Sequence, residues 1–269
     1  MTNTVRYPLI LGVVCLAAGL ALAITFNLTI DRIEDKNDQK RAAAIVTAFF
    51  DAQPQTNTWN NVKEFDAQTH QRVQQRRKGQ QTYLVAYRDD AQTDVLGYAA
   101  EGSFQGYSSK IVALVGVEPL PDAQDGDYRI LGVRIIHQNE TPGLGSQSNQ
   151  VFSDETIWSW ASSLLTGDED GEAVVPTDRQ QQALGQDVVL MPRPAFEQQF
   201  TGKIVTVTDE GLEGLQLEKG AWEAIKQGEK RDSIAAITGA TVTSNAATNA
   251  VIQAIETIDH ILATRPEPR

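Results

Sequence analysis

A run of hydroxyl-bearing and small residues, TGATVTS at positions 238–244, precedes the last helical pattern of the sequence. Apolar residues spaced along one helix face predict that helix from Asn245 to about Ala263. The start of a helix offers unpaired N–H groups and partial positive charge, which would stabilise a phosphate group without lysine side chains. Taken alone, however, the run is more typical of a turn followed by a helix cap, with Thr243 or Ser244 as the capping residue.

A second candidate segment, HQNETPGLG at positions 137–145, follows a run typical of a strand. A proline followed by a glycine suits a type II turn, which would hold Glu140 and Thr141 rigidly at the end of that strand. Taken alone, this segment is more typical of a surface turn whose glutamate is solvated.

Other kinds of chemistry are made improbable by what the sequence lacks. With Cys15 as the only cysteine, the chain cannot form an internal disulfide, a cysteine zinc site or an iron–sulfur cluster of its own. The three histidines show no ligand-like spacing, so no metal site is predicted, and no common hydrolase motif is present. A net charge of -12 argues against nucleic-acid binding. Redox work by this chain would therefore need an organic cofactor.

The first thirty residues predict a membrane anchor. Residues 7–26 are almost continuously apolar and, as a helix, are long enough to cross a bilayer. The alternative is a cleavable signal peptide, because Ala21-Leu22-Ala23 matches a cleavage site, but the apolar run continues past it. Basic residues on both sides of the run leave the orientation of the anchor open.

The sequence divides into three predicted regions. Residues 1–30 form the anchor, and residues 31–81 form a juxtamembrane helix followed by a polar connection with little core. Residues 82–269 form a further domain, in which a long acidic stretch, about 147–194, is predicted to be a loop or an insertion with a partner contact.

The further domain is predicted to belong to the α+β class. Short runs rich in Val, Ile and Tyr are separated by turn-forming segments, with no helical pattern between them, which indicates an antiparallel meander. These runs lie at residues 82–88, 95–101, 110–118 and 130–137, and a further strand is expected at 204–209.

Together, and in this order behind a membrane helix, ETPGLG and [ST]GAT-x-[ST]S resemble the motifs of a known family. It comprises the covalent FMN-binding subunits of ion-translocating membrane oxidoreductases: the G subunit of the Rnf complex and the C subunit of the sodium-pumping NADH:quinone reductase. Three stretches resemble the Rnf version in particular: GYSSKIVALVGVE, FEQQFTGK and AITGATVTSNAATNAVIQAI. The resemblance covers roughly residues 95–145 and 195–258, as well as the anchor.

The resemblance implies covalent FMN, its phosphate esterified by a flavin transferase to the threonine that ends [ST]GAT, which is Thr241 here. It implies no catalytic residue of the chain's own: the flavin would pass electrons to or from other membrane and iron–sulfur subunits of a translocase. It also implies an inner-membrane protein whose flavin domain lies on the periplasmic side. The residues implied to bind the cofactor are Thr238, Gly239, Ala240, Thr241, Thr243, Ser244, Glu140, Thr141, Gly143, Leu144 and Lys203.

Two features depart from the family pattern. The family often has an aspartate three residues before the first residue of [ST]GAT, where this chain has Ala235, and the stretch at 147–194 is longer and more acidic than expected. They leave room for a second hypothesis, a membrane-anchored FMN-binding regulatory or scaffold module without electron transfer. The C subunit of the sodium-pumping reductase is the close alternative within the family.

Overall fold

The computed structural model describes residues 3–50, 72–89, 91–120, 126–141, 145–149 and 194–263. It divides into two compact units, Met1–Arg41 and Ala42–Arg269. Helix α1 (Asn3–Phe50) supplies the described part of the first unit and also enters the second. Its residues Ile10–Ile30 are apolar and long enough to cross a membrane, as predicted, although a signal sequence passes the same test.

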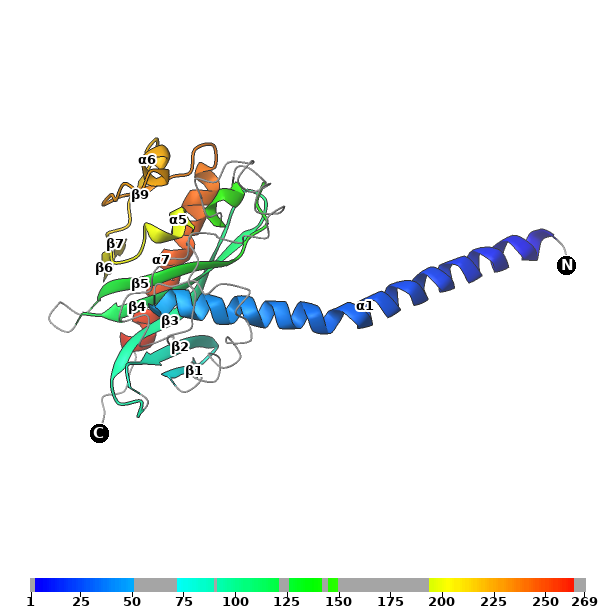
Figure 1. Cartoon of the computed structure of the whole chain (residues 1–269), viewed down its shortest axis with the longest axis horizontal. Helices are drawn as coiled ribbons and strands as arrows, with labels where there is room; N and C mark the ends of the chain where they lie inside the picture. Colours follow the sequence, from blue (N-terminus) through cyan, green and yellow to red (C-terminus); the bar gives the residue numbers. More distant parts are fainter. Residues whose placement is uncertain are drawn as a thin grey trace, which may run out of the picture. The chain divides into compact units, whose positions relative to one another are not determined.

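The second unit is built on a seven-stranded sheet in which each strand pairs with the next strand along the chain (Figure 1). All of these pairs are antiparallel, so the predicted meander is confirmed. The strands are β1 (Val73–Lys78), β2 (Gln81–Tyr87), β3 (Val95–Gln105), β4 (Lys110–Pro119), β5 (Asp127–His137), β6 (Ile204–Thr208) and β7 (Gly211–Glu213).

Strand β1 was missed by the sequence analysis, which placed its residues in a polar connection. Its sequence, VQQRRK, has one apolar residue, Val73, and that is its one buried side chain. The strand lies at the edge of the sheet, where polar side chains are tolerated because one side of the backbone ladder faces away from the other strands. Hydrophobic alternation therefore could not reveal it.

Helices cover the two faces of the sheet. Side chains alternate along a strand, so Val115 of β4 belongs to the core under helix α7 (Thr241–Ala263), whereas Leu114 packs with Ala48 and Phe49 of α1. The backbone of α1 lies directly on two paired glycines, Gly116 and Gly132. A Cβ atom at either position would lie 2.1 Å from a carbonyl oxygen of α1, so only glycine fits this approach.

Helix α7 begins earlier than predicted. The structure starts it at Thr241 and not at Asn245, so the prediction that Thr243 or Ser244 caps it was wrong. Both residues lie inside its first turns, and their hydroxyl groups bond to Glu140 and to Ile237. The predicted apolar face is confirmed at Val251, Ile255 and Ile258, which are buried.

Short elements complete the second unit. A two-stranded parallel sheet joins β8 to β9, and a short 3₁₀ helix lies in the segment between β5 and β6. These elements are the 3₁₀ helix η2 (Gly145–Asn149), α5 (Ala195–Gln198), β8 (Leu217–Glu218), α6 (Trp222–Lys226) and β9 (Ile234–Ala235).

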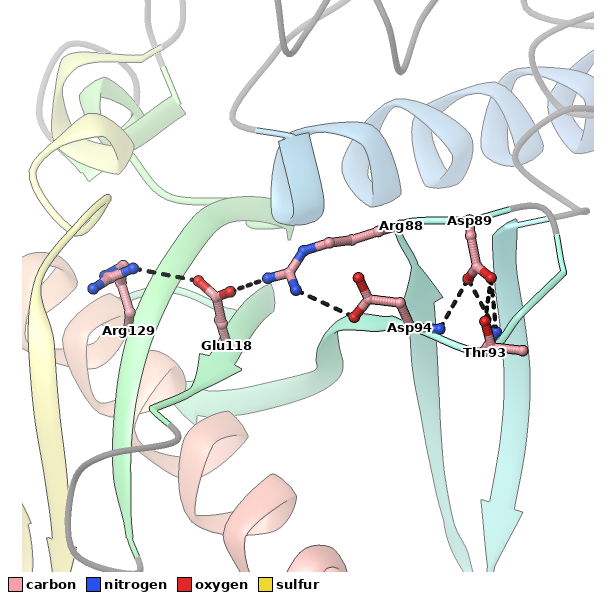
Figure 2. Close-up of polar contacts among 6 residues, drawn as sticks. All are labelled: Arg88, Asp89, Thr93, Asp94, Glu118 and Arg129. Atoms are coloured by element: carbon pink, nitrogen blue, oxygen red, sulfur yellow. Dashed lines mark hydrogen bonds and ion pairs between the residues drawn. The ribbon is translucent and has the colours of Figure 1, made fainter.

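One end of the seven-stranded sheet carries a chain of alternating charges (Figure 2). This is the end where β2 leads into β3 and β4 leads into β5. Glu118 lies between Arg88 and Arg129, and Arg88 also contacts Asp94, 3.3 Å away. In the same turn Asp89 accepts hydrogen bonds from Thr93 and from the backbone N–H of Asp94. The other end of the sheet holds the two candidate segments.

Candidate functional site

The TGAT segment forms a tight turn that leads directly into α7. The backbone N–H of Ala240 donates to the carbonyl oxygen of Ile237 at 3.0 Å, and Gly239 between them has φ of 79°. A positive φ at the third position is the mark of a type II turn, which other residue types adopt only with strain. Thr238 and Gly239 are exposed. The turn therefore presents its tip to solvent.

Ser244 holds this turn against the helix. Its side chain is fully buried, accepts a hydrogen bond from the backbone N–H of Ile237 at 2.9 Å, and donates to the carbonyl oxygen of Ala240 at 3.0 Å. Both ends of the four-residue turn are thus bonded to one side chain in α7. Ser244 therefore shapes the turn from inside the helix.

Thr241 is the first residue of α7 and is half-buried. No hydrogen bond of its hydroxyl group is found among the described residues. The first N–H groups of a helix have no partner within it, so α7 offers donors and partial positive charge beside this hydroxyl group. The next side chain, Val242, is 56% exposed. Thr241 thus lies at the end of the helix that suits an anion, and it is not fully buried.

Glu140 follows β5 and is buried, with an exposed fraction of 6%. It is therefore not the solvated glutamate of an ordinary surface turn. Its Oε1 accepts hydrogen bonds from the backbone N–H groups of Ser108 at 3.1 Å and Ser109 at 3.0 Å. Its Oε2 accepts a hydrogen bond from Oγ1 of Thr243 at 2.8 Å. One carboxylate thus joins the turn between β3 and β4 to the first turn of α7.

The electrostatics of Glu140 follow from these contacts. Burial by itself would raise the pKa of this carboxyl group, but the hydrogen bonds from Thr243, Ser109 and Ser108 outweigh it and lower the pKa below its ordinary value. No cationic side chain contacts Glu140 among the described residues. The charge is therefore held by neutral donors alone.

Two glycines allow this close packing. A Cβ atom on Gly106 would lie 2.5 Å from Oε1 of Glu140 and 2.8 Å from the carbonyl oxygen of Ser109. A Cβ atom on Gly145 would lie 2.6 Å from Oγ1 of Thr243. Gly106 and the serines of its turn were missed as site residues. Their one signal was a GYSS segment between two predicted strands, where glycine and serine are also ordinary turn residues.

The remaining residues implied by the resemblance are placed as follows. Thr141 is exposed, and its carbonyl oxygen accepts a hydrogen bond from the N–H of Ser146 at 3.3 Å. Gly143 and Leu144 lie outside the described residues, as does most of the acidic stretch at 147–194. Ala240, the last residue of the turn, is buried. No group of three histidine, cysteine, aspartate or glutamate side chains that could hold a metal ion occurs in the part of the chain that the structure describes.

Lys203 lies directly before β6. No contact between Lys203 and Thr241 is found among the described residues. Its ammonium group donates hydrogen bonds to the carbonyl oxygens of Arg231 at 2.8 Å and Asp232 at 2.6 Å. Burial lowers the pKa of Lys203 below its ordinary value, and the nearby carboxylate of Asp232 opposes that shift. In this arrangement the lysine fixes the segment that leads to β9 and the TGAT turn.

Ala235, the departure from the family pattern, is fully buried in β9. The side-chain amide of Gln199 binds its backbone on both sides: Oε1 accepts from the N–H of Ala235 at 2.7 Å, and Nε2 donates to its carbonyl oxygen at 3.4 Å. Ala235 belongs to the hydrophobic core of the second unit, so an aspartate in the same place would bury its carboxylate there. The position is thus built for a small apolar side chain.

Comparison with known proteins relates this geometry to a family. The model of the FMN-binding domain matches residues 106–256, which is more than half of the chain and includes both candidate segments. The G subunit of the Na(+)-translocating ferredoxin:NAD(+) oxidoreductase complex of Acetobacterium woodii is 28% identical over 156 residues, which is 56% of this chain and 67% of that protein. The G subunit of the ion-translocating oxidoreductase complex of Haemophilus influenzae is 27% identical over 219 residues, which is 75% of this chain and 97% of that protein.

Among solved structures, the crystal structure of NqrC from Shewanella oneidensis is similar at 20% identity and a TM-score of 0.40, covering 69% of this chain and 62% of that chain. The resemblance to the G subunits seen in the sequence is confirmed by the named relatives. With the family model spanning residues 106–256, from the turn that binds Glu140 into α7, the chain belongs to the FMN-binding domain family.

Proposed function

We propose that this chain is the electron-carrying subunit of a membrane-bound, ion-translocating oxidoreductase of the Rnf type, with FMN esterified through its phosphate to Thr241. The observation that carries the proposal is the position of Thr241, at the start of a 23-residue helix and directly after an exposed type II turn. When bound, FMN supplies one-electron and two-electron transfer, for which the chain has no group of its own.

The residues of the turn fit a phosphate group. A phosphodiester keeps one negative charge, and the unpaired N–H groups at the start of α7 are suited to bind it. Thr238 and Gly239 present an exposed backbone, so a ligand can approach it closely. Thr243 and Ser244 support this arrangement from inside the helix, because their hydroxyl groups already bond to Glu140 and to Ile237.

The surrounding residues have three kinds of role in this proposal. Glu140 and Thr141 would lie beside the cofactor, and the resemblance implies the same role for Gly143 and Leu144, while Lys203 would act at a distance by holding the segment before β9. Val242 and Tyr107, exposed at 56% and 74%, offer apolar surface near Thr241 and near the turn that binds Glu140. Burial of this apolar surface would favour the binding of a flat aromatic ring.

The relatives support the proposal that this chain works in a complex. Both named relatives are subunits of ion-translocating oxidoreductase complexes, which supports partner subunits for this chain. We propose that these partners include other membrane and iron–sulfur subunits. The apolar helix at Ile10–Ile30 supports anchoring to a membrane. We place the anchor, residues 1–30, in the inner membrane and the flavin domain, residues 82–269, on its periplasmic side, where a flavin transferase would attach the cofactor from FAD.

A second candidate function is a membrane-anchored FMN-binding regulatory or scaffold module without electron transfer. The observation that favours it is Ala235, whose buried position lacks the carboxylate that the family often has there. If the transferase needs that carboxylate, the chain would hold FMN without a covalent bond. The C subunit of the sodium-pumping reductase is the corresponding alternative within the proposed class.

Covalent attachment is tested in the full-length chain produced together with a flavin transferase. We expect the wild-type protein to fluoresce in a denaturing gel and to gain the mass of one FMN, whereas Thr241→Ala is dark and has the mass of the unmodified chain. Thr241→Ser should retain fluorescence, since it keeps a hydroxyl group. Thr257→Ala, at a half-buried threonine further along α7, is the matched control and should match the wild type.

The outcomes separate the candidates. Equal fluorescence in Thr241→Ala would show that another residue carries the flavin. A dark wild-type chain that still binds FMN reversibly would favour the regulatory module, and an Ala235→Asp variant that becomes fluorescent would identify the missing carboxylate as the reason.

A further inference from the structure

The carboxylate of Glu140 ties the two candidate segments together through side chains. Glu140 and Thr243 are 103 positions apart in the sequence, yet their side chains are joined by a hydrogen bond of 2.8 Å. The same carboxylate binds the backbone of Ser108 and Ser109 through its other oxygen. Three parts of the chain therefore meet at one buried group.

The supporting contacts leave this carboxylate little freedom. The N–H of Glu140 donates to the side chain of Gln138 at 3.0 Å, and the N–H of Asn139 donates to Oγ of Ser109 at 2.7 Å. Gly106 and Gly145 pack so closely around it that a Cβ atom at either place would collide. A side chain held on both oxygens and on its own backbone acts as a fixed link between its neighbours.

The position of Thr243 gives this link a functional direction. It lies two residues after Thr241, in the same first turn of α7, so any movement of Thr243 moves the residue proposed to carry the flavin. On the other side, Ser108 follows Tyr107, whose ring is exposed. The carboxylate therefore sets the distance between the start of α7 and the turn at residues 106–109.

We propose that Glu140 is a positioning residue that holds the first turn of α7 and the turn at residues 106–109 in one arrangement around the flavin on Thr241. This inference rests on the proposed function for the flavin itself. Because its hydrogen bonds lower the pKa of Glu140 and no described cation contacts it, the carboxylate would also add one negative charge beside the flavin. That charge disfavours the reduced, more negative form of the cofactor.

The main experiment compares Glu140→Ala, Glu140→Gln and Thr243→Val in the full-length chain produced with the transferase. We measure the fraction carrying covalent FMN by intact mass, the fluorescence anisotropy of the attached flavin, and its midpoint potential. Glu140→Ala should lower the attached fraction several-fold and lower the anisotropy. Glu140→Gln should restore both in large part, because its amide keeps the shape, while its midpoint potential rises since the charge is lost.

Controls separate positioning from general stability. Glu118→Gln removes a carboxylate that is bound by two arginines at the other end of the sheet, and it should leave all three measurements unchanged. Wild-type attachment, anisotropy and potential in Glu140→Ala would overturn the proposal. If Glu140→Ala does not fold, Thr243→Val decides, since it removes one donor at nearly constant shape and should lower the anisotropy.

A final measurement does not depend on the flavin. Amide hydrogen exchange across residues 238–248 of the flavin-free, full-length chain reports directly on the first turn of α7. Faster exchange there in Glu140→Ala than in Glu118→Gln is expected, and equal exchange would overturn the proposal. If the wild-type chain gains no covalent FMN but exchange is still faster in Glu140→Ala than in Glu118→Gln, the proposed attachment is contradicted and the role of Glu140 in holding the turn is not.

Discussion

The two ends of the seven-stranded sheet hold their carboxylates in different ways. At one end Glu140 is 6% exposed and is bound by backbone N–H groups and hydroxyl groups, with no cation in contact among the described residues. At the other end the side chain of Glu118 is 17% exposed and lies between Arg88 and Arg129, which are 44% and 47% exposed (Figure 2). At the first end the carboxylate is held by hydrogen bonds from neutral donors, and at the second end it is held by ion pairs.

The difference indicates where a small change has a large effect. Exposed ion pairs contribute about 0–1 kcal/mol each, because water already solvates both partners. A buried polar group that loses its partner costs about 1–3 kcal/mol, since no water replaces the lost bond. The end that holds Glu140 is therefore the sensitive one, and it is also the end that carries the proposed flavin residue. The other end can vary in sequence at little cost.

The largest effect is expected for Gly106→Ala. The new methyl group would meet Oε1 of Glu140 and the carbonyl oxygen of Ser109, so the turn must shift and its bonds to Glu140 weaken. We expect a loss of about 1–3 kcal/mol in the free energy of unfolding, measured by urea denaturation in detergent with the fluorescence of buried Trp222. In Gly79→Ala the added methyl group meets open space at φ of 59°, so this variant shows the cost of backbone strain without crowding, whereas Gly106 has no positive φ. An unchanged free energy of unfolding in Gly106→Ala would contradict the crowding argument.

An intermediate effect is expected on the pH dependence of stability. The pKa of Glu140 is lower in the folded chain than in the unfolded chain, so the unfolded chain binds more protons as the pH falls. The stabilisation by Glu140 is thus complete above its unfolded pKa and is lost as the pH falls through its folded value. Glu140→Gln should flatten the acid side of the stability curve, measured by urea denaturation between neutral and acid pH. An unchanged slope would show that folding does not lower the pKa of this carboxyl group.

A smaller effect is expected at the opposite end. Arg88→Ala removes contacts to Glu118 and Asp94, but all three side chains reach solvent. We expect the free energy of unfolding to fall by at most about 1 kcal/mol, and by less at high salt. The same denaturation assay at two ionic strengths checks this. A loss larger than that of Gly106→Ala would reverse the comparison between the two ends.

Much of the fold could be predicted because its strands follow simple rules. The four central strands have apolar residues dense enough to stand out, and the turns between them carry glycine, aspartate and proline. Strand β1 escaped because it pairs through its backbone at the edge while its side chains are polar. The start of α7 was misjudged because Thr243 and Ser244 look like capping residues but bond elsewhere.

The site could be predicted only as two separate segments. Glycine and threonine in the TGAT run indicate a turn at a helix start, and the structure has that turn. The bond between Glu140 and Thr243 could not be predicted from either segment, because it depends on how the sheet places residues 103 positions apart. The turn at residues 106–109 was also not predicted, since Ser108 and Ser109 act through backbone N–H groups, which every residue type except proline has.

The order of the elements along the chain has a consequence for how the protein folds during synthesis. Helix α7 follows every strand, yet its buried face closes the core that β3, β4 and β5 share with it. Until the ribosome has made α7, that face of the sheet stays uncovered, and a partly made chain would display Val115, Val133 and Ile135 to its surroundings. Such an intermediate would tend to associate with other chains through this apolar face. A truncation that removes α7 should therefore aggregate and not merely lose a binding residue.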